Sequence, residues 1–206
     1  MCGRYKLSAK RSDLERAFPW LDDEEYFDIH GPYDRREIFP GTNILALNNH
    51  RRPEEVWWTI RDRTWDDKMA SAINAKAETI QKVGMFREAF KSDRVLIPAT
   101  ALYEWQEQPD KSKKKFEIWF DEAVFAFAGV ARDCEIKGET KRCAVIITTS
   151  PNDVFREIHN TKMRQAVVIR GEDHERWLDP KTPVDELKRL MQPLPSEMTH
   201  AKPAEG

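Results

Sequence analysis

Hydrophobic residues recur along the chain in short runs that predict strands. Along residues 116–121, Phe, Ile and Phe alternate with Glu, Trp and Asp, which is the two-residue period of a half-buried strand. Residues 123–130 and 143–149 are almost continuously apolar, which favours strands buried on both faces. Shorter apolar runs predict further strands at residues 43–47, 56–60, 94–98 and 167–169.

Helical spacing of apolar residues is confined to short segments. Helices are predicted at residues 12–21, 84–90, 152–159 and 184–191 and around Trp177. Ser12 and Glu15 have the spacing of a capping box at the start of the first helix. Asn152 or Asp153 can cap the third. The pattern is therefore one of many strands with short helices between and after them.

The order of these elements predicts an α+β fold. Strands come in runs with hairpin-length gaps, which favours a curved, mostly antiparallel β-sheet or barrel core with short peripheral helices. No internal repeat or low-complexity linker divides the chain, so we expect a single domain over residues 1–192. Residues 193–206 are polar and contain three prolines, and this pattern predicts a mobile C-terminal tail.

Composition places the chain among soluble globular proteins. Its 206 residues are 40% hydrophobic and 34% charged, with a formal net charge of -2. A protein of this charge is no general polyanion binder, so any nucleic-acid surface must be a local basic patch. The sequence lacks an apolar run long enough for a membrane span, and MCGRYKLSAK lacks the apolar stretch of a signal peptide. We therefore expect a cytoplasmic protein that makes no membrane contact.

The chain has three cysteines, Cys2, Cys134 and Cys143, and in the cytoplasm they should stay reduced. Their spacing fits no zinc motif, and an odd number leaves one unpaired in any disulfide scheme. Each is therefore either a core thiol or a reactive one. We predict neither a bound metal nor a cofactor.

Aminopeptidases remove an initiator methionine when a small side chain follows it. If Met1 is removed in this way, Cys2 offers two nucleophiles, its α-amine and its thiol. Its α-amine, with a pKa of ~7.7–8.0, and its thiol, at ~8.5, are both more available at neutral pH than a lysine amine at ~10.4. With an aldehyde, the amine forms a Schiff base and the thiol then closes a five-membered thiazolidine ring. The nearby cation Arg4 is expected to lower the thiol pKa. Taken alone, however, a cysteine at position 2 is often without function.

Four short motifs occur in order along the chain. They are MCGRY at the start, INAKAET at 73–79, IPA at 97–99 with YEW at 103–105, and TTS at 148–150 with IHN at 158–160. Together they resemble the SOS response-associated peptidase (SRAP) family, also called abasic site processing proteins. The resemblance covers residues 2–169 and implies an SRAP-like fold. It also implies a covalent thiazolidine crosslink between the N-terminal cysteine and an abasic site in single-stranded DNA.

Carried over position by position, the resemblance implies that Cys2, Asn74, Glu104 and His159 are the active residues, with Thr148 near them. Glu104 is suited to general acid–base work in opening the sugar ring, and its aromatic neighbours should raise its pKa. His159 can hold the sugar or a phosphate, or move a proton. Asn74 can orient Cys2 without adding charge. The family's peptidase label mainly concerns removal of residues ahead of the cysteine, and a lyase activity is possible.

The resemblance also predicts how DNA is held. Arg4, Lys76, Lys162 and Arg164 are candidate phosphate contacts, and Arg87 is a weaker one. Pro40, Gly41, Met85 and Trp105 occupy positions that contact unstacked bases. Each cation can equally be a solvated surface charge, and Met85 and Trp105 can be core residues. Departures from the family pattern at Trp58, Arg61, Gln165 and Ala166 leave the details of DNA binding open.

Two other functions remain open. Cys2, His159 and Asn74 are the residue types of a thiol protease, so a cysteine peptidase acting on other proteins is one alternative. A passive single-strand-binding module is the second, although it leaves Cys2 and Glu104 without a role. The leading interpretation is a monomeric, nucleoid-associated protein whose partner is single-stranded DNA containing abasic sites.

Overall fold

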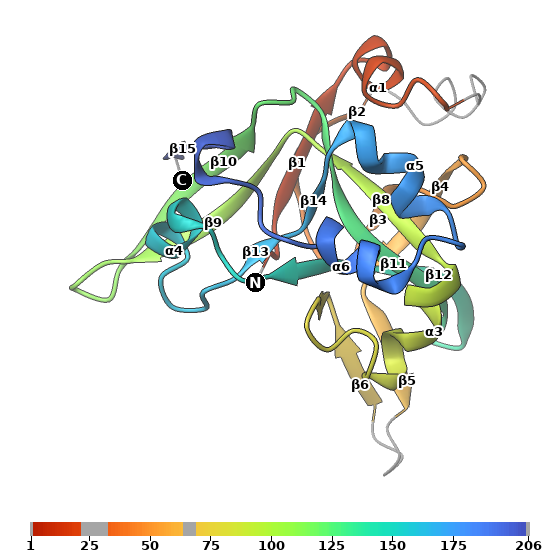
Figure 1. Ribbon diagram of the computed structural model, residues 1–206. Coiled ribbons are helices and arrows are strands. Elements are labelled where there is room, and N and C mark those ends of the chain that lie inside the picture. The colour runs from red at the N-terminus through yellow and green to blue at the C-terminus, as the bar shows by residue number, and fades with distance from the viewer. Residues whose placement is uncertain (1, 22–32, 64–68, 205–206) are drawn as a thin grey trace.

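The structure is a computed structural model that describes residues 2–21, 33–63 and 69–204 (Figure 1). Two β-sheets and a small hairpin carry most of these residues. The small hairpin pairs β5 (Ile60–Arg63) with β6 (Met69–Ala72). The α+β class and the mostly antiparallel sheets are as predicted, and among the described residues no helix is long and apolar enough to cross a membrane.

The first sheet has five strands in the order β15-β10-β9-β1-β2. Their bounds are β1 Tyr5–Ala9, β2 Tyr33–Ile38, β9 Ala101–Glu107, β10 Lys113–Phe120 and β15 Thr199–Pro203. The hairpin of β9 and β10 extends at the left of Figure 1, with a short helix packed against it. In β10, Ile118 and Phe120 are buried and Glu117 and Trp119 are not, which confirms the predicted alternation.

The second sheet closes on itself. Its strands run β12-β4-β3-β8-β11, and β11 pairs again with β12, so five strands form a barrel. The barrel strands are β3 Asn43–Leu47, β4 Pro53–Trp58, β8 Arg94–Ala99, β11 Phe125–Ile136 and β12 Glu139–Thr149. Three short strands extend it, namely β7 Asn74–Lys76, β13 Gln165–Ala166 and β14 Val168–Ile169.

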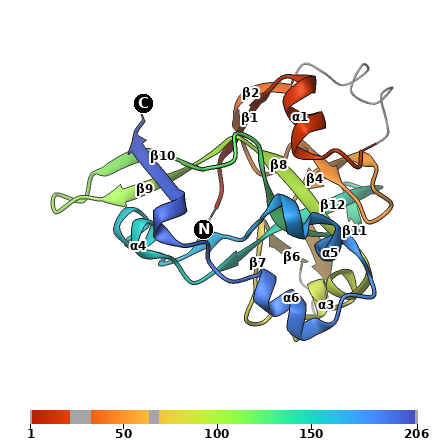
Figure 2. The same cartoon turned by 45° about the horizontal axis from the view of Figure 1, so that its top comes forward.

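Short helices cover the outside of the barrel and the open sheet (Figures 1 and 2). They are α1 Arg11–Ala17, α3 Gly84–Ser92, α4 Asp153–Ile158, α5 His174–Leu178 and α6 Val184–Leu190, with single 3-10 turns η1 Gly171–Asp173 and η2 Ser196–Met198. In α4, the side chain of Asn152 accepts a hydrogen bond from the Phe155 N–H, as expected of an N-cap.

Two local predictions are wrong. The capping box of α1 does not use Ser12 and Glu15, because the N-cap lies two residues earlier, at Lys10, and the Lys10 N–H donates to the Asp13 carboxylate at 3.0 Å. The predicted mobile tail contains an ordered strand. Residues 199–203 form β15, which pairs with β10 from Thr199 opposite Phe120 to Pro203 opposite Phe116. Pairing with a distant strand supplies the backbone partners that the local sequence does not reveal.

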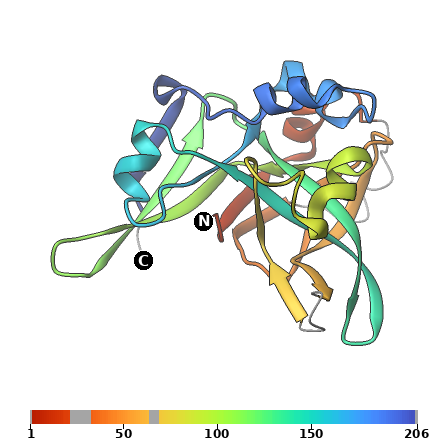
Figure 3. The same ribbon diagram turned by 60° about the horizontal axis from the view of Figure 1, so that its bottom comes forward.

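Close packing between the barrel strands explains one glycine. A Cβ on Gly129 would lie 2.9 Å from both Ile97 Cδ1 and Val95 Cγ2 and 3.0 Å from the Val145 carbonyl oxygen, so no side chain fits there. In the open sheet, the first residues of β1 pair with the start of β9, Tyr5 opposite Leu102 and Lys6 opposite Ala101. This connection brings the start of the chain to the middle of the molecule, between the barrel and the β9–β10 hairpin (Figure 3).

Candidate functional site

The centre of the site is a buried carboxyl–imidazole pair. His159 Nε2 lies 3.5 Å from Glu104 Oε2, and both side chains are at most 6% exposed. His159 Nδ1 is 2.8 Å from the carbonyl oxygen of Arg164. A carbonyl only accepts, so Nδ1 carries the proton and the lone pair of Nε2 points to Glu104.

Two hydrogen bonds, each between a side chain and the backbone, hold the elements that carry this pair together. Glu104 is on β9, and His159 is the C-cap residue of α4. The Gln106 side chain donates to the Glu157 carbonyl at 3.1 Å, and the Asn160 side chain accepts from the Glu107 N–H at 3.0 Å. The end of α4 is thus fastened to β9 on both sides of His159.

Burial changes the protonation of both groups. Desolvation raises the pKa of Glu104 to about 7, and the same cause lowers the pKa of His159 to about 4. At neutral pH the imidazole is neutral, whereas the carboxyl group is divided between its two forms. Glu104 Oε1 is buried and has no hydrogen-bond partner among the described residues. The carboxyl group therefore has one oxygen free for another molecule and can either give or take a proton there.

Cys2 is fully buried and lies within electrostatic reach of Glu104. Burial, and after it the Glu104 charge, raises the pKa of the Cys2 thiol. The net shift is therefore opposite to the expected one. A hydrogen bond to the Arg4 backbone does lower the Cys2 pKa, but burial outweighs it, and the Arg4 guanidinium faces elsewhere. It lies 4.4 Å from the ring centre of Phe39, 4.8 Å from that of Trp105, and 3.4 Å from Glu37.

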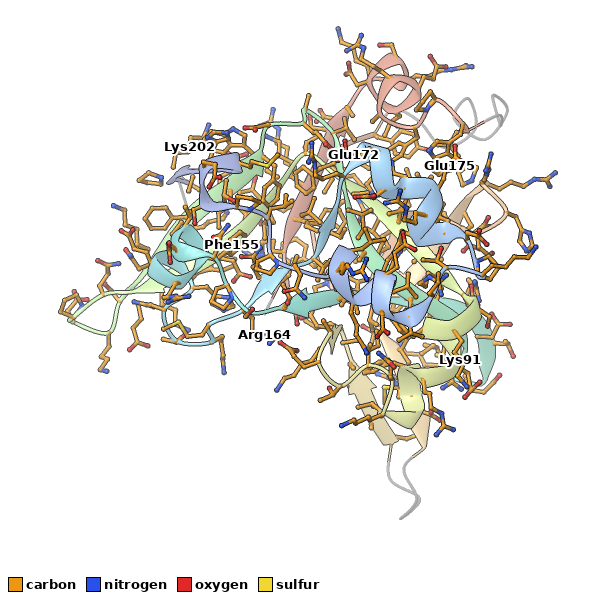
Figure 4. The ribbon with its side chains drawn as sticks, viewed as in Figure 1. Lys91, Phe155, Arg164, Glu172, Glu175 and Lys202 are labelled. Carbon is orange, nitrogen blue, oxygen red and sulfur yellow. The ribbon has the colours of Figure 1, made fainter. Side chains whose placement is uncertain are left out.

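The Thr148 side of the site gathers three more predicted residues. Lys76 on β7 is the strand partner of Thr148 on β12, and the Arg164 guanidinium donates to the Thr148 carbonyl at 2.6 Å. Arg164 also forms a bidentate ion pair with Glu78, with nitrogen–oxygen distances of 2.7 and 2.9 Å. Any phosphate contact by Arg164 must therefore compete with a carboxylate already in place. Figure 4 shows Arg164 below α4, between the β9–β10 hairpin and the barrel.

Asn74 sits at the edge of this group. Its side-chain N–H donates to the Ile146 carbonyl at 3.3 Å, while its Oδ1 is buried without a partner among the described residues. No contact in the described part of the chain joins Asn74 to Cys2. A role in orienting Cys2 stays a prediction, although the unpartnered oxygen is a suitable acceptor for an amine.

A pocket of about 360 Å³, here called the Glu104 pocket, opens beside the carboxyl–imidazole pair. Its lining residues are Glu104, Trp105, Glu107, Lys113, His159, Thr161 and Lys162. The predicted residues Trp105 and Lys162 are therefore in the same cavity as Glu104. Lys113, on the neighbouring strand, belongs to it as well and was not predicted. Its position follows from the pairing of β10 with β9, which no local motif reveals.

The remaining predicted contacts divide into two cases. Pro40 and Gly41 form a turn next to Phe39, which is 40% exposed and holds the Arg4 cation, so this turn adjoins the site. Phe39 itself was missed. Met85, by contrast, packs partly against the core on α3, and its carbonyl accepts from Arg132 at 3.3 Å. None of the contacts described here brings Met85 to the Glu104 pocket.

The positions that depart from the family pattern have structural roles. Trp58 is buried in the core, where its indole N–H donates to the Ile73 carbonyl at 2.9 Å. The Gln165 side chain accepts from the Asn152 N–H at 2.6 Å, next to the buried Ala166. Arg61 lines a separate hollow near β5. Trp58, Arg61, Gln165 and Ala166 are not among the residues that line the Glu104 pocket.

The other two cysteines are buried on β11 and β12, away from the chain start, and both are free thiols. Within the described residues, no group of three or more His, Cys, Asp or Glu side chains is arranged to hold a metal ion.

A family model described as SOS response associated peptidase (SRAP) matches residues 1–205, so the chain belongs to this family. The abasic site processing protein YoqW of Bacillus subtilis is 33% identical over 96% of this chain and 89% of its own length. YoaM of the same bacterium, which has the same descriptive name, is 34% identical over 96% and 88%. YedK of Escherichia coli, also an abasic site processing protein, is 26% identical over 86% and 79%.

Solved structures show the same fold. A crystal structure of a protein from Bacteroides thetaiotaomicron superposes with a TM-score of 0.85 at 24% identity, covering 100% of this chain and 93% of that one. A second, from Bordetella bronchiseptica, has a TM-score of 0.81 at 17% identity, and the match covers both chains completely. The barrel and the attached sheet are thus a shared architecture.

Proposed function

We propose that this protein processes abasic sites in single-stranded DNA by forming a covalent thiazolidine crosslink through Cys2 after Met1 is removed. Its relatives at 33–34% identity are abasic site processing proteins, which supports the substrate. The observation that carries the chemistry is Glu104, a buried carboxyl group with a pKa of about 7 that lies beside both Cys2 and His159.

The protonation states set the order of steps. Because burial keeps the Cys2 thiol protonated at neutral pH, the α-amine released by loss of Met1 is the first nucleophile. The amine adds to the aldehyde carbon of the ring-opened sugar, and Glu104 in its acid form donates a proton to the departing oxygen. One water leaves and a Schiff base remains.

The second step returns the proton. Glu104, now a carboxylate, accepts the thiol proton as the Cys2 sulfur adds to the carbon of the protonated Schiff base left by the first step. The C=N electron pair moves to the nitrogen, which already carries its proton, and gives the neutral ring amine. Aldehyde plus aminothiol thus give thiazolidine plus water. A carboxyl group with a pKa near the working pH suits both directions of transfer. His159 Nε2, 3.5 Å from Glu104 Oε2, is placed to accept a hydrogen bond from the acid form of Glu104 and so to orient it.

The same geometry disfavours a general thiol peptidase. Such an enzyme needs an imidazole that takes the thiol proton, but the lone pair of His159 Nε2 faces Glu104, and burial lowers the His159 pKa to about 4. We propose that peptidase activity is limited to removal of Met1. A lyase activity would require that the Schiff base forms but that the thiazolidine ring does not close.

A denaturing gel tests the crosslink directly. Purified protein is mixed with single-stranded DNA carrying one abasic site, and mass spectrometry first establishes whether Met1 is absent. We expect a heat-stable shifted band that needs no reductant. Absence of this band in protein that lacks Met1 would overturn the proposal.

Two substitutions of Cys2 separate the steps. Cys2→Ser keeps the terminal amine but lacks the thiol, so it should give a band only after borohydride reduction traps the Schiff base. If Cys2→Ser forms a heat-stable band without reductant, the thiazolidine assignment is wrong. Cleavage of an unrelated peptide by the unsubstituted protein, lost in Cys2→Ser, would instead favour the general peptidase.

A further inference from the structure

The outer face of the five-stranded sheet carries aromatic rings with cations placed over them. Lys115 Nζ lies 4.5 Å from the ring centre of Tyr103, and Lys202 Nζ lies 5.4 Å from that of Trp119. Together with Arg4 over Trp105, these pairs extend over β1, β9, β10 and β15. Strand register puts them on one face, because Lys115 is paired with Trp105 and Glu117 with Tyr103 and Lys202.

A hollow of about 630 Å³ lies on this face and is here called the lysine groove. Its charged lining residues are the four cations Lys6, Arg36, Lys115 and Lys202 and the two carboxylates Glu37 and Glu117. Glu117 is only 15% exposed and contacts Lys6 and Lys202 at 3.2 and 3.3 Å. The groove therefore has an excess of positive charge in a chain whose net charge is -2.

The lysine groove and the Glu104 pocket lie next to each other along β9 and β10. Trp105 lines the pocket, and its strand partner Lys115 lines the groove. Glu37, which lines the groove, forms ion pairs with both Lys115 and Arg4, and the Arg4 guanidinium lies over Trp105 of the pocket. On β10, Lys115 and Trp119 are four residues apart, which corresponds to about 13 Å along the strand.

We infer that the lysine groove binds the stretch of single-stranded DNA next to the nucleotide held in the Glu104 pocket. The inference rests on the proposed function for its ligand. Lysine side chains meet backbone phosphates, and the partly exposed rings of Trp105 and Trp119 offer stacking surfaces that accept any base. A lesion reader needs such sequence-tolerant contacts, because the bases beside an abasic site vary.

Paired lysines are compatible with this role. The Lys202 side chain is 62% exposed, and ion pairs at that exposure are worth at most about 1 kcal/mol, so a phosphate can displace Glu117 from it. Glu117 also keeps the two lysine ammonium groups apart when no DNA is bound. The arrangement resembles an open sheet surface with basic and aromatic residues, which favours single strands over duplexes.

The test compares two lengths of undamaged single-stranded DNA, about 5 and about 20 nucleotides, within the range of sites on such surfaces. The variant is K6Q/K202Q, and its matched control is K91Q/K181Q. Figure 4 shows Lys91 and Lys202 on opposite sides of the molecule. Both double variants remove two positive charges from exposed or half-exposed positions, so a general charge effect is the same in each.

We expect K6Q/K202Q to weaken binding of the longer DNA about tenfold, with a salt slope lower by about 1.4 for two lost phosphate contacts. Binding of the shorter DNA should not change. K6R/K202R should restore the affinity, and unchanged thermal unfolding would show that the fold is intact. If K6Q/K202Q binds the longer DNA as K91Q/K181Q does, the groove takes no DNA.

The crosslinking assay with abasic DNA distinguishes a failure of the groove assignment from a failure of the proposed function. If crosslinking succeeds but K6Q/K202Q behaves like its control, only the groove assignment fails. If the salt slope changes as expected but no crosslink forms with a short abasic DNA, the groove assignment holds and the covalent function fails.

Discussion

Two regions of the molecule each bury a histidine, and they differ in the features that support a proposed reactive site at one of them. His159 lies in the Glu104 pocket, and His174 lies at the start of α5 against Phe18 and Trp20. Burial lowers the pKa of each to about 4. Each ring also contacts a backbone carbonyl, that of Arg164 at 2.8 Å for His159 and that of Ile169 at 3.2 Å for His174.

The difference lies at the second ring nitrogen. His174 Nδ1 is buried without a hydrogen-bond partner among the described residues, and the ring stacks on Phe18 with centres 5.0 Å apart. His159 Nε2 instead faces a carboxyl group at the wall of a pocket. A shifted pKa alone therefore marks burial. A site requires a second titratable group with a shifted pKa and an opening between that pair and solvent.

The largest expected effect comes from Glu104→Gln. This change keeps the size of the side chain but removes its proton transfer, so the crosslinking rate should fall by about 10²–10⁴. DNA affinity should change little, because Glu104 carries no phosphate contact. Single-turnover crosslinking with saturating abasic DNA measures the rate. An unchanged rate would remove Glu104 from the chemistry.

Exchanging the two histidines for alanine sharpens the comparison. His159→Ala should slow crosslinking about a hundredfold, because Glu104 loses the group that orients it. His174→Ala should leave the rate unchanged but lower the free energy of unfolding by about 2–3 kcal/mol, because it opens a cavity against Phe18 and Trp20. Denaturant unfolding beside the rate assay checks both. Equal rate losses would mean that the two regions do not differ in function.

The pH dependence of stability separates the carboxyl group from both histidines. Because the pKa of Glu104 is raised from 4.5 to about 7, wild-type stability from this group is highest below pH 4.5 and falls as pH rises to 7. Both histidines act in the opposite direction, since their stability is complete above pH 6.5 and is lost as pH falls to about 4.

Glu104→Gln removes only the first of these contributions. Its stability advantage over the wild type should therefore grow between pH 5 and pH 8, by on the order of 3 kcal/mol for 2.5 pKa units. Urea unfolding of both proteins at the two pH values measures it. A constant difference would show that the Glu104 pKa is not raised in the folded protein.

The sequence predicts the elements of this fold that depend on local pattern. The helix at 84–90 is α3, with Phe86, Ala89 and Phe90 buried as their spacing indicates. The continuous apolar runs correspond to the barrel strands β11 and β12, which extend beyond them into the polar hairpin. Strand β15 was missed, because its residues gain a strand's hydrogen bonds only from β10, about eighty positions earlier in the chain.

The candidate site, like the fold, has features that local sequence predicts and features that depend on contacts between distant residues. Short motifs identify Cys2, Glu104 and His159, and the structure brings Glu104 into contact with His159 and within electrostatic reach of Cys2. The direction of the Cys2 pKa shift was wrong, because it depends on burial and on where the Arg4 side chain points. Phe39 and Lys113 were missed. Lys113 comes to the pocket only through the pairing of β10 with β9, and Phe39 is linked to Trp105 only through the Arg4 guanidinium that contacts both rings. Nonlocal contacts thus decide the electrostatics that a motif leaves open.

The smallest expected effect concerns Glu78, which holds Arg164 at the edge of the site. Glu78→Gln should increase affinity for single-stranded DNA a few-fold, because it releases the Arg164 guanidinium for a phosphate. Stability should change by less than about 1 kcal/mol, since the Glu78 side chain is 50% exposed. Glu172→Gln removes an equal charge from another exposed pair, with Arg170, and Glu172 lies well above Arg164 in Figure 4. If both variants raise the affinity equally, net charge alone accounts for the gain, and Arg164 then belongs with His174 among the residues that serve the fold.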